Sequence, residues 1–175
     1  MRKVLYILGQ LSDSDVDWLG RIGTRSKLVK GTPLIKFGVN LTQVFIVLEG
    51  EMLIQSDKGV ELARVGAGEI LGEMSLVDSR PPSASVTVAQ DSYVLALEKK
   101  VLQNKLDTDN GFAARFYRAI AIFLSERMRG TIKNLGYGND ADEAVADPDE
   151  LDSNVLDNVH LAGARFDRML QTLMG

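Results

Sequence analysis

The feature that most constrains the fold of this chain is a series of short β-like runs between residues 32 and 98. Glycine, asparagine and aspartate separate the runs, as turn residues do between strands. Gly50 stands inside an apolar run, where it predicts a tight reversal or a bulge that needs a positive φ. Short strands at this spacing are typical of a β-sandwich or a jelly roll. The predicted strands are 32–37, 43–49, 51–56, 60–65, 69–71, 85–90 and 92–98.

One segment among these strands, Gly72–Val86, is suited to holding a small anion, and we call it the cassette. It reads GEMSLVDSRPPSASV. Its first glycine allows a close approach of the backbone, and a helix start after it would present N–H groups to an anion. Glu73 is able to accept a hydrogen bond from a sugar hydroxyl, whereas Ser83 and Ser85 are able to donate to phosphate oxygens. The cassette is therefore the predicted ligand site.

The cassette resembles the phosphate-binding cassette of the cyclic-nucleotide-binding domains, the family of bacterial catabolite activators and of the regulatory subunits of cyclic-AMP-dependent kinase. In that family the segment reads Gly-Glu, a small apolar helical turn, and then Pro-Arg-small-Ala-Thr/Ser-Val. The resemblance covers about residues 12–132 and implies a mainly β fold, a double-stranded β-helix (jelly roll) with an N-terminal helix and C-terminal helices. The matching positions are Gly72, Glu73, Leu76, Pro81, Ser83, Ala84, Ser85 and Val86.

This cassette departs from the family pattern at Pro82, which stands where the family has the arginine that pairs with the cyclic phosphate. The resemblance implies cyclic AMP or cyclic GMP as the ligand. Without a bidentate arginine we expect such binding to be weak. Arg80 would compensate only if the loop returned its side chain to the site. The predicted ligand-binding residues are Gly72, Glu73, Met74, Ser75, Arg80, Pro82, Ser83, Ala84 and Ser85.

Helices are predicted on both sides of the strands. Ser12 and Asp15 form a capping-box pattern at the start of a helix over Leu11–Ile22. Residues 4–8 before it are compatible with a strand or with a buried arm. After Glu98 the chain becomes helical, first over a short segment and then over a longer one that Asp109-Asn110 would cap.

Two long apolar stripes lead to a prediction of a homodimer, because together they exceed what one roll should need to cover it. The first stripe lies within 112–132 and the second within 151–173, so either helix is a candidate for the seam. The first comprises Phe112, Phe116, Ala119, Phe123 and Leu124, widened by Ile120, Met128 and Ile132. The second comprises Leu151, Val155, Val159, Ala162, Phe166, Met169 and Leu173.

The charge distribution divides the chain into three predicted parts. The net charge is −4, but residues 1–133 hold 18 Lys/Arg against 15 Asp/Glu, whereas 134–160 hold eight acids and no Lys or Arg. We expect a ligand-binding roll over 1–133, an acidic linker over 134–150 and an amphipathic helix over 151–175. The linker is either a solvated connection or a docking patch for a basic protein partner, which the sequence does not identify.

Composition and motifs disfavour several function classes. The chain has no cysteine, and His160 is its only histidine, so a metal site is not expected. No catalytic triad or Walker loop is present, and catalysis is not predicted. The absence of cysteine fits a cytoplasmic protein. No apolar stretch approaches the roughly 18 residues of a membrane span.

Two functional hypotheses stay open at the level of sequence. The chain resembles small bacterial single-domain members of the family that lack a helix-turn-helix, and no basic recognition helix follows residue 133, so DNA is not an expected partner. The first hypothesis is a regulatory sensor of a cyclic nucleotide or related small phosphate ligand, signalling through helix rearrangement. The second is a degenerate nucleotide pocket that serves as a protein-interaction or scaffold module.

Overall fold

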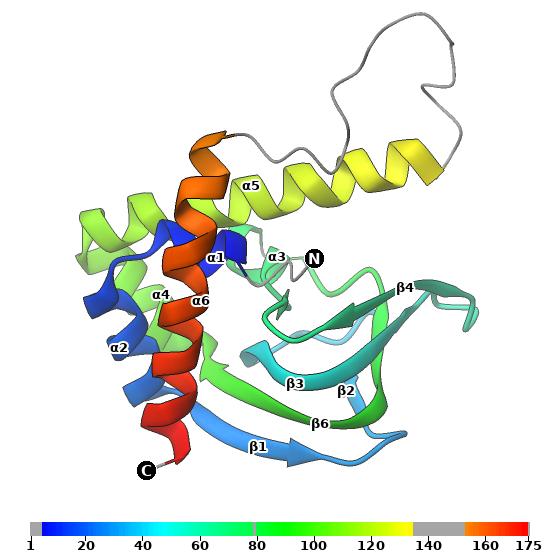
Figure 1. The fold of residues 1–175 in the computed structure, drawn as a ribbon. Coiled ribbons are helices and arrows are strands. Elements are labelled where there is room, and N and C mark those ends of the chain that lie inside the picture. Colours follow the sequence, from blue (N-terminus) through cyan, green and yellow to red (C-terminus); the bar gives the residue numbers. More distant parts are fainter. Residues whose placement is uncertain (1–4, 79, 135–152, 175) are drawn as a thin grey trace, which may run out of the picture.

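The computed structural model describes residues 5–78, 80–134 and 153–174, and it shows a β-roll with most of its helices at one side and one long helix across the top of the view (Figure 1). The mainly β jelly-roll class with flanking helices is confirmed. The helices are α1 (Leu5–Gln10), α2 (Asp13–Ile22), α3 (Met74–Val77), α4 (Lys99–Thr108), α5 (Asn110–Asn134) and α6 (Ser153–Met174). The strands are β1 (Thr24–Leu28), β2 (Pro33–Ile35), β3 (Gln43–Gln55), β4 (Glu61–Gly66), β5 (Ile70–Leu71) and β6 (Ser85–Glu98).

The roll is built on two long strands, β3 and β6, which pair antiparallel from Gln43 opposite Glu98 to Gln55 opposite Ser85. The prediction had divided each of them into two strands. Gly50 does adopt a positive φ of 96°, but the pairing shifts register around it and the strand continues, so the glycine makes a bulge rather than an end. The remaining strands complete the sheet in the order β1-β6-β3-β4, with β2 on β6 and β5 on β3.

Two elements near the N-terminus differ from the sequence prediction. Residues 5–10 form α1, a helix, where a strand or a buried arm had been considered; Ile7 and Leu8 are buried in the core. β1 had not been predicted, because its sequence TRSKL lacks an apolar alternation. It forms by pairing with β6 along its whole length. The capping box of α2 is confirmed, with Ser12 N donating to Asp15 Oδ2 at 2.8 Å.

The apolar stripes of α5 and α6 are buried within one chain. Phe112, Phe116 and Phe123 of α5 share a core with Phe166 and Met169 of α6. α6 packs along α1 and α2, as Figure 1 shows for the orange-to-red helix beside the blue ones. Other helices of the same chain therefore cover the described part of the second stripe. This packing removes the reason for expecting a dimer seam there.

The outer part of the first stripe differs from the prediction. Met128 and Ile132 do not widen the buried stripe of α5, since both are exposed, Met128 by 63%. Their positions along the helix place them on another face. Most of the predicted acidic linker over 134–150 lies outside the described residues, as do Leu151 and the side chains of Val155, Val159 and His160. None of the described helices is long and apolar enough to cross a membrane.

Candidate ligand site at the cassette

The start of the cassette is a tight turn that only glycine fits. Gly72 has a φ of 83°, and a Cβ there would lie 2.8 Å from Leu41 Cδ1. Ser75 donates to Gly72 O through both its backbone N–H, at 3.2 Å, and its Oγ, at 2.6 Å. Leu76 N likewise donates to Glu73 O. These two N–H groups of the short helix α3 are therefore occupied within the turn. The sequence analysis had instead suggested that they would be presented to an anion.

Glu73 is buried and already has a charged partner. Only 2% of its surface is exposed, and Arg127 Nη1 on α5 donates to its Oε1 at 3.0 Å. Arg127 Nη2 also lies 3.5 Å from Oε2 of Glu69, a second carboxylate that is only 5% exposed. The arginine is held on its own helix by Phe123, whose ring centroid lies 4.3 Å from its guanidinium carbon. One guanidinium thus serves two buried carboxylates.

The electrostatics of this cluster make Glu73 harder to ionise than an exposed glutamate. Burial raises the pKa of Glu73 above its ordinary value, because desolvation penalises the charged form. The charge of Arg127 opposes this shift, whereas the nearby charge of Glu69 adds to it. Since the pKa stays raised, the single arginine does not fully offset the burial of the carboxyl group.

The second half of the cassette is held by the loop that follows β2. Gly38 N donates to Pro82 O at 2.9 Å, and Phe37 N donates to Ser85 Oγ at 3.0 Å. Ser85 keeps its own hydroxyl proton for another acceptor. Ser83 is exposed and Ala84 is half-buried. This half of the cassette presents hydroxyl groups and no cationic side chain.

Arg80 does not take the place of the missing arginine. Its side chain is 87% exposed, and its Nε lies 3.9 Å from Oδ2 of Asp78. Its backbone N–H also donates to Asp78 Oδ1 at 3.1 Å. The side chain is therefore held toward solvent beside its neighbour in sequence. Met74, another predicted site residue, is half exposed on α3.

Sequence reasoning missed the two residues that complete the cluster, Arg127 and Glu69. A signal for Arg127 was present, because it follows Phe123 by four residues and so stands on the buried face of α5. A charged residue at such a position needs a buried partner. No local pattern pointed to Glu69, whose proximity to Arg127 depends on α5 crossing the roll.

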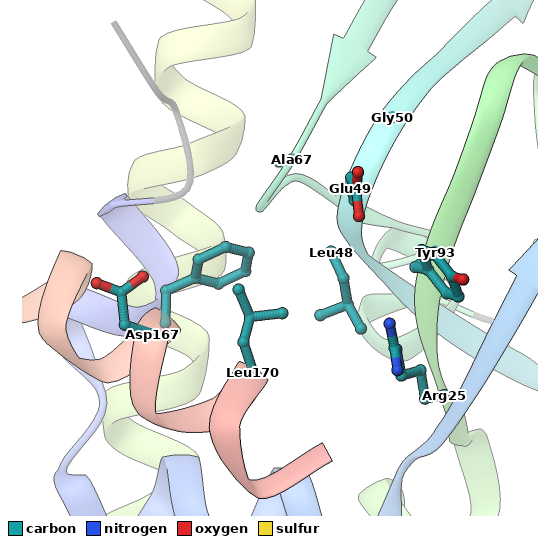
Figure 2. A pocket seen from close by; sticks show the side chains of 9 residues that line it. Arg25, Leu48, Glu49, Gly50, Ala67, Tyr93, Asp167 and Leu170 are labelled. Carbon is teal, nitrogen blue, oxygen red and sulfur yellow. The ribbon is translucent and has the colours of Figure 1, made fainter. Parts of the chain in front are cut away.

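A cavity of about 270 Å³ lies elsewhere, between α6 and the roll. In Figure 2, Leu48 of β3 and Leu170 of α6 point toward one another across it, and Arg25 lies beside Tyr93. The guanidinium carbon of Arg25 is 4.1 Å from the centre of the Tyr93 ring. None of the predicted ligand-binding residues lines this cavity. It lies where α6 meets the sheet and is separate from the cassette.

The described residues offer no metal centre. No group of three or more His, Asp or Glu side chains within them is arranged to hold an ion. The two carboxylates near Arg127 are engaged by that arginine instead.

Comparison with known proteins places the chain in a family. The model of the cyclic nucleotide-binding domain matches residues 25–109. A cyclic nucleotide-binding domain from Methylobacillus flagellatus has a TM-score of 0.68 at 22% identity, with 81% of this chain and 85% of that chain covered. The N-terminal domain of a transcriptional regulator from Streptomyces coelicolor A3(2) is 30% identical, with a TM-score of 0.58 and coverages of 81% and 99%.

The catabolite activator protein of Thermus thermophilus is also similar, at 24% identity and a TM-score of 0.62 over 75% of this chain, which spans 62% of that protein. A search of curated protein sequences finds no match. The matched segment contains the whole cassette and both long strands of the roll. The chain therefore belongs to the family of cyclic nucleotide-binding domains.

Proposed function

We propose that this chain is a non-catalytic regulatory module that binds a cyclic nucleotide or a related small ligand at the cassette and passes the binding event to α5. Domains of this family are regulatory rather than catalytic. The observation that carries the proposal is the ion pair between Glu73 and Arg127, which joins the cassette to the long helix at 3.0 Å.

Ligand binding at Glu73 would change the environment of Arg127. A ribose hydroxyl that donates to the carboxylate must displace the guanidinium or share the carboxylate with it. Because the Glu73 side chain is only 3% exposed, access to it requires the segment of α5 around Arg127 to move. Binding at the cassette would thereby become a displacement of the second half of α5.

Two measurements test this function. Calorimetric titration with cyclic AMP, cyclic GMP and a cyclic dinucleotide measures binding. Amide hydrogen exchange then tests whether binding displaces the second half of α5. We expect the ligand to raise the exchange rate of residues 124–134 in the native chain but not in the Arg127→Met variant. Binding without any change in exchange would contradict the proposed displacement of α5. The absence of binding by every nucleotide-type ligand would contradict the proposal that the chain binds such a ligand.

A second function is favoured by the side chains at the phosphate end of the cassette. Pro82 replaces the arginine, and Arg80 points to solvent. A site without that cation is compatible with a lapsed pocket, in which case the domain would act as an interaction or scaffold module for an unidentified protein partner. The same titrations separate the two functions, because a lapsed pocket binds none of the ligands.

We also propose that two copies of the chain pair through an exposed apolar stripe on α5. The members of this stripe recur every three or four residues, which is the spacing of a coiled-coil seam. They are the exposed Ala114, Tyr117, Ala121, Met128 and Ile132, together with Leu124, which is half-buried against the core of its own chain. Tyr117, Met128 and Ile132 are exposed in the single chain, so pairing would remove apolar surface from water.

Light scattering at micromolar concentration tests the pairing. We expect a mass of about twice the 19.2 kDa of the chain, and we expect Met128→Lys to halve it by placing a charge in the seam. Val101→Lys is the matched control, because Val101 is an exposed apolar residue on α4, outside the stripe. A monomeric native protein would overturn the proposal.

A further inference from the structure

The cavity between α6 and the roll combines an apolar wall with charged side chains. Leu48 of β3 and Phe166 of α6 are buried, and they form the apolar wall together with Ala67 and Leu170. The volume of about 270 Å³ lies just below the roughly 300–1,000 Å³ of pockets that hold drug-sized ligands. The cavity therefore suits a smaller molecule with an apolar body.

Two opposite charges lie beside the ring of Tyr93 in this cavity. The guanidinium carbon of Arg25 is 4.1 Å from the centre of that ring. Glu49 stands directly opposite Tyr93 in the pairing of β3 with β6, and residues in that relation are neighbours on one face of a sheet. Figure 2 shows Arg25 and Glu49 on the same side of the cavity as Leu48, across from Leu170. Both charged residues are exposed, so a ligand can reach them from solvent.

Neither of these two charges has a polar partner within the part of the chain that the structure describes. No described residue forms a hydrogen bond or an ion pair with the side chain of Arg25 or of Glu49, so the two do not pair with each other. A guanidinium over an aromatic face uses its flat side there, and its N–H donors lie in its own plane. Arg25 is therefore placed by Tyr93 with its donors available for a carboxylate, the group that fits the fork of an arginine best.

The third charged residue of the lining is Asp167 on α6. Its carboxylate points away from Leu48 in Figure 2, which leaves Glu49 as the carboxylate on the side of Arg25. A ligand with a carboxylate alone would meet repulsion from both acids, and a ligand with an ammonium alone would leave Arg25 without an anion. A zwitterion avoids both costs, because it brings a carboxylate for Arg25 and an ammonium for Glu49.

We propose that this cavity binds a free amino acid with an apolar side chain. The carboxylate of the ligand accepts from Arg25, its ammonium donates to Glu49, and its side chain packs between Leu48 and Leu170. The site is separate from the cassette and does not rest on the function proposed for it. Because β3 forms one wall and α6 the other, the bound amino acid also holds α6 against the roll.

Calorimetry on the full chain at pH 7 and one salt concentration tests the ligand class. The probes are L-leucine and L-phenylalanine, each compared with an analogue that lacks the ammonium and one that lacks the carboxylate. These analogues are isocaproate and isoamylamine for leucine, and hydrocinnamate and phenethylamine for phenylalanine. We expect at least one amino acid to bind about tenfold more tightly than both of its analogues, the scale of one charge-assisted hydrogen bond.

Two variants test where the amino acid binds. Arg25→Gln should remove the preference for the amino acid over its amine analogue, because the ligand carboxylate loses its partner. Glu49→Gln should remove the preference over the carboxylate analogue for the corresponding reason. Lys27→Gln is the matched control, since Lys27 is an exposed cation on the same strand as Arg25 but does not line the cavity. Thermal unfolding of the three variants checks that they fold.

Each outcome decides for or against the cavity as an amino-acid site. An amino acid that binds no more tightly than its analogues overturns the proposal, and so does the absence of binding by all six probes. A preference that survives Arg25→Gln or Glu49→Gln places the ligand elsewhere and overturns it as well. A preference that both substitutions remove and Lys27→Gln retains supports the proposal. The comparison of probes on the native chain needs no variant.

Discussion

Arg115 on α5 holds Asp15 on α2 through two parallel hydrogen bonds, from Nε to Oδ2 at 2.7 Å and from Nη2 to Oδ1 at 3.0 Å. The same carboxylate accepts the backbone N–H of Ser12 and so completes the capping box of α2. One buried side chain, 6% exposed, therefore both starts a helix and joins it to another helix 100 residues later in the chain.

Replacing Asp15 with alanine should lower the free energy of unfolding by about 1–3 kcal/mol, because the variant loses a helix cap and leaves Arg115 without its partner. Urea unfolding followed by circular dichroism measures the change. Glu61→Ala is the control, since its ion pair with Arg64 is exposed to solvent and should contribute little. Equal effects of the two substitutions would contradict this account.

The contribution of Asp15 should depend on pH. Burial by itself would raise the pKa of Asp15, but hydrogen bonds from Arg115 and Ser12 outweigh it and hold the pKa below its ordinary value of 3.8. Stability from a carboxyl with a lowered pKa is present above the ordinary value and is lost as pH falls through the folded value. The difference in unfolding free energy between the native chain and Asp15→Asn should therefore shrink below about pH 3.8. A constant difference down to pH 2 would contradict the assignment.

Arg127→Met should destabilise the fold at pH 7 by about 3–5 kcal/mol, the usual cost of removing one partner from a buried ion pair. Arg129→Met, on the exposed side of the same helix, should have little effect. Urea unfolding of both variants at pH 7 gives the comparison. If the two changes cost the same, Arg127 does not neutralise the cluster.

The loss of unfolding free energy caused by Arg127→Met should be smaller at acid pH. The pKa of Glu73 is already raised by burial, and removing the opposing charge of Arg127 raises it further. A raised carboxyl pKa gives stability that is present below the ordinary value, 4.5, and is lost as pH rises through the folded value. Urea unfolding at pH 4 and pH 7 should therefore show a smaller cost at pH 4.

Phe166→Ala should destabilise the single chain, by about 3–5 kcal/mol, rather than only weaken a dimer. Phe166 is 5% exposed and shares its core with α1, α2 and α5. Leu161→Ala is the control, because Leu161 lies on the outer face of α6 and is half exposed. Thermal unfolding and light scattering together distinguish the outcomes; a lower mass with an unchanged melting temperature would return Phe166 to an interface between copies.

Gly50→Ala should cost more stability than Gly31→Ala, although both glycines have a positive φ, of 96° and 89°. At Gly31 nothing lies within 4 Å of an added Cβ, so only backbone strain, about 1–2 kcal/mol, is paid there. At Gly50 the Cβ would also collide with Ser92 Oγ and lie 2.8 Å from Asp91 O. Denaturant midpoints of the two variants test the difference, and equal midpoints would show that the bulge yields without cost.

The features that sequence analysis predicted correctly depend on residues close together in the chain. The capping box needs Ser12 and Asp15 three residues apart, and the buried stripe of α5 needs only the helical period. The positive φ of Gly50 is likewise local. The cassette was identified because its fifteen residues are contiguous, and the family assignment followed from them.

Tertiary structure alone decided the features that join distant residues. β1 has no apolar alternation of its own and exists because β6 offers it a free edge some 70 residues later. Whether α6 covers its own chain depended on α1 being a helix beside it. Most of all, the partner of Glu73 depended on where α5 crosses the roll. The sequence determined that a carboxylate stands in the cassette. Only the packing of α5 decided that Arg127, 54 residues later in the chain, contacts that carboxylate and offsets part of its charge. Local periodicity is set by backbone geometry, so it is visible in the sequence. The pairing of distant groups is set by which surfaces are buried against one another, and no local pattern in the sequence records that.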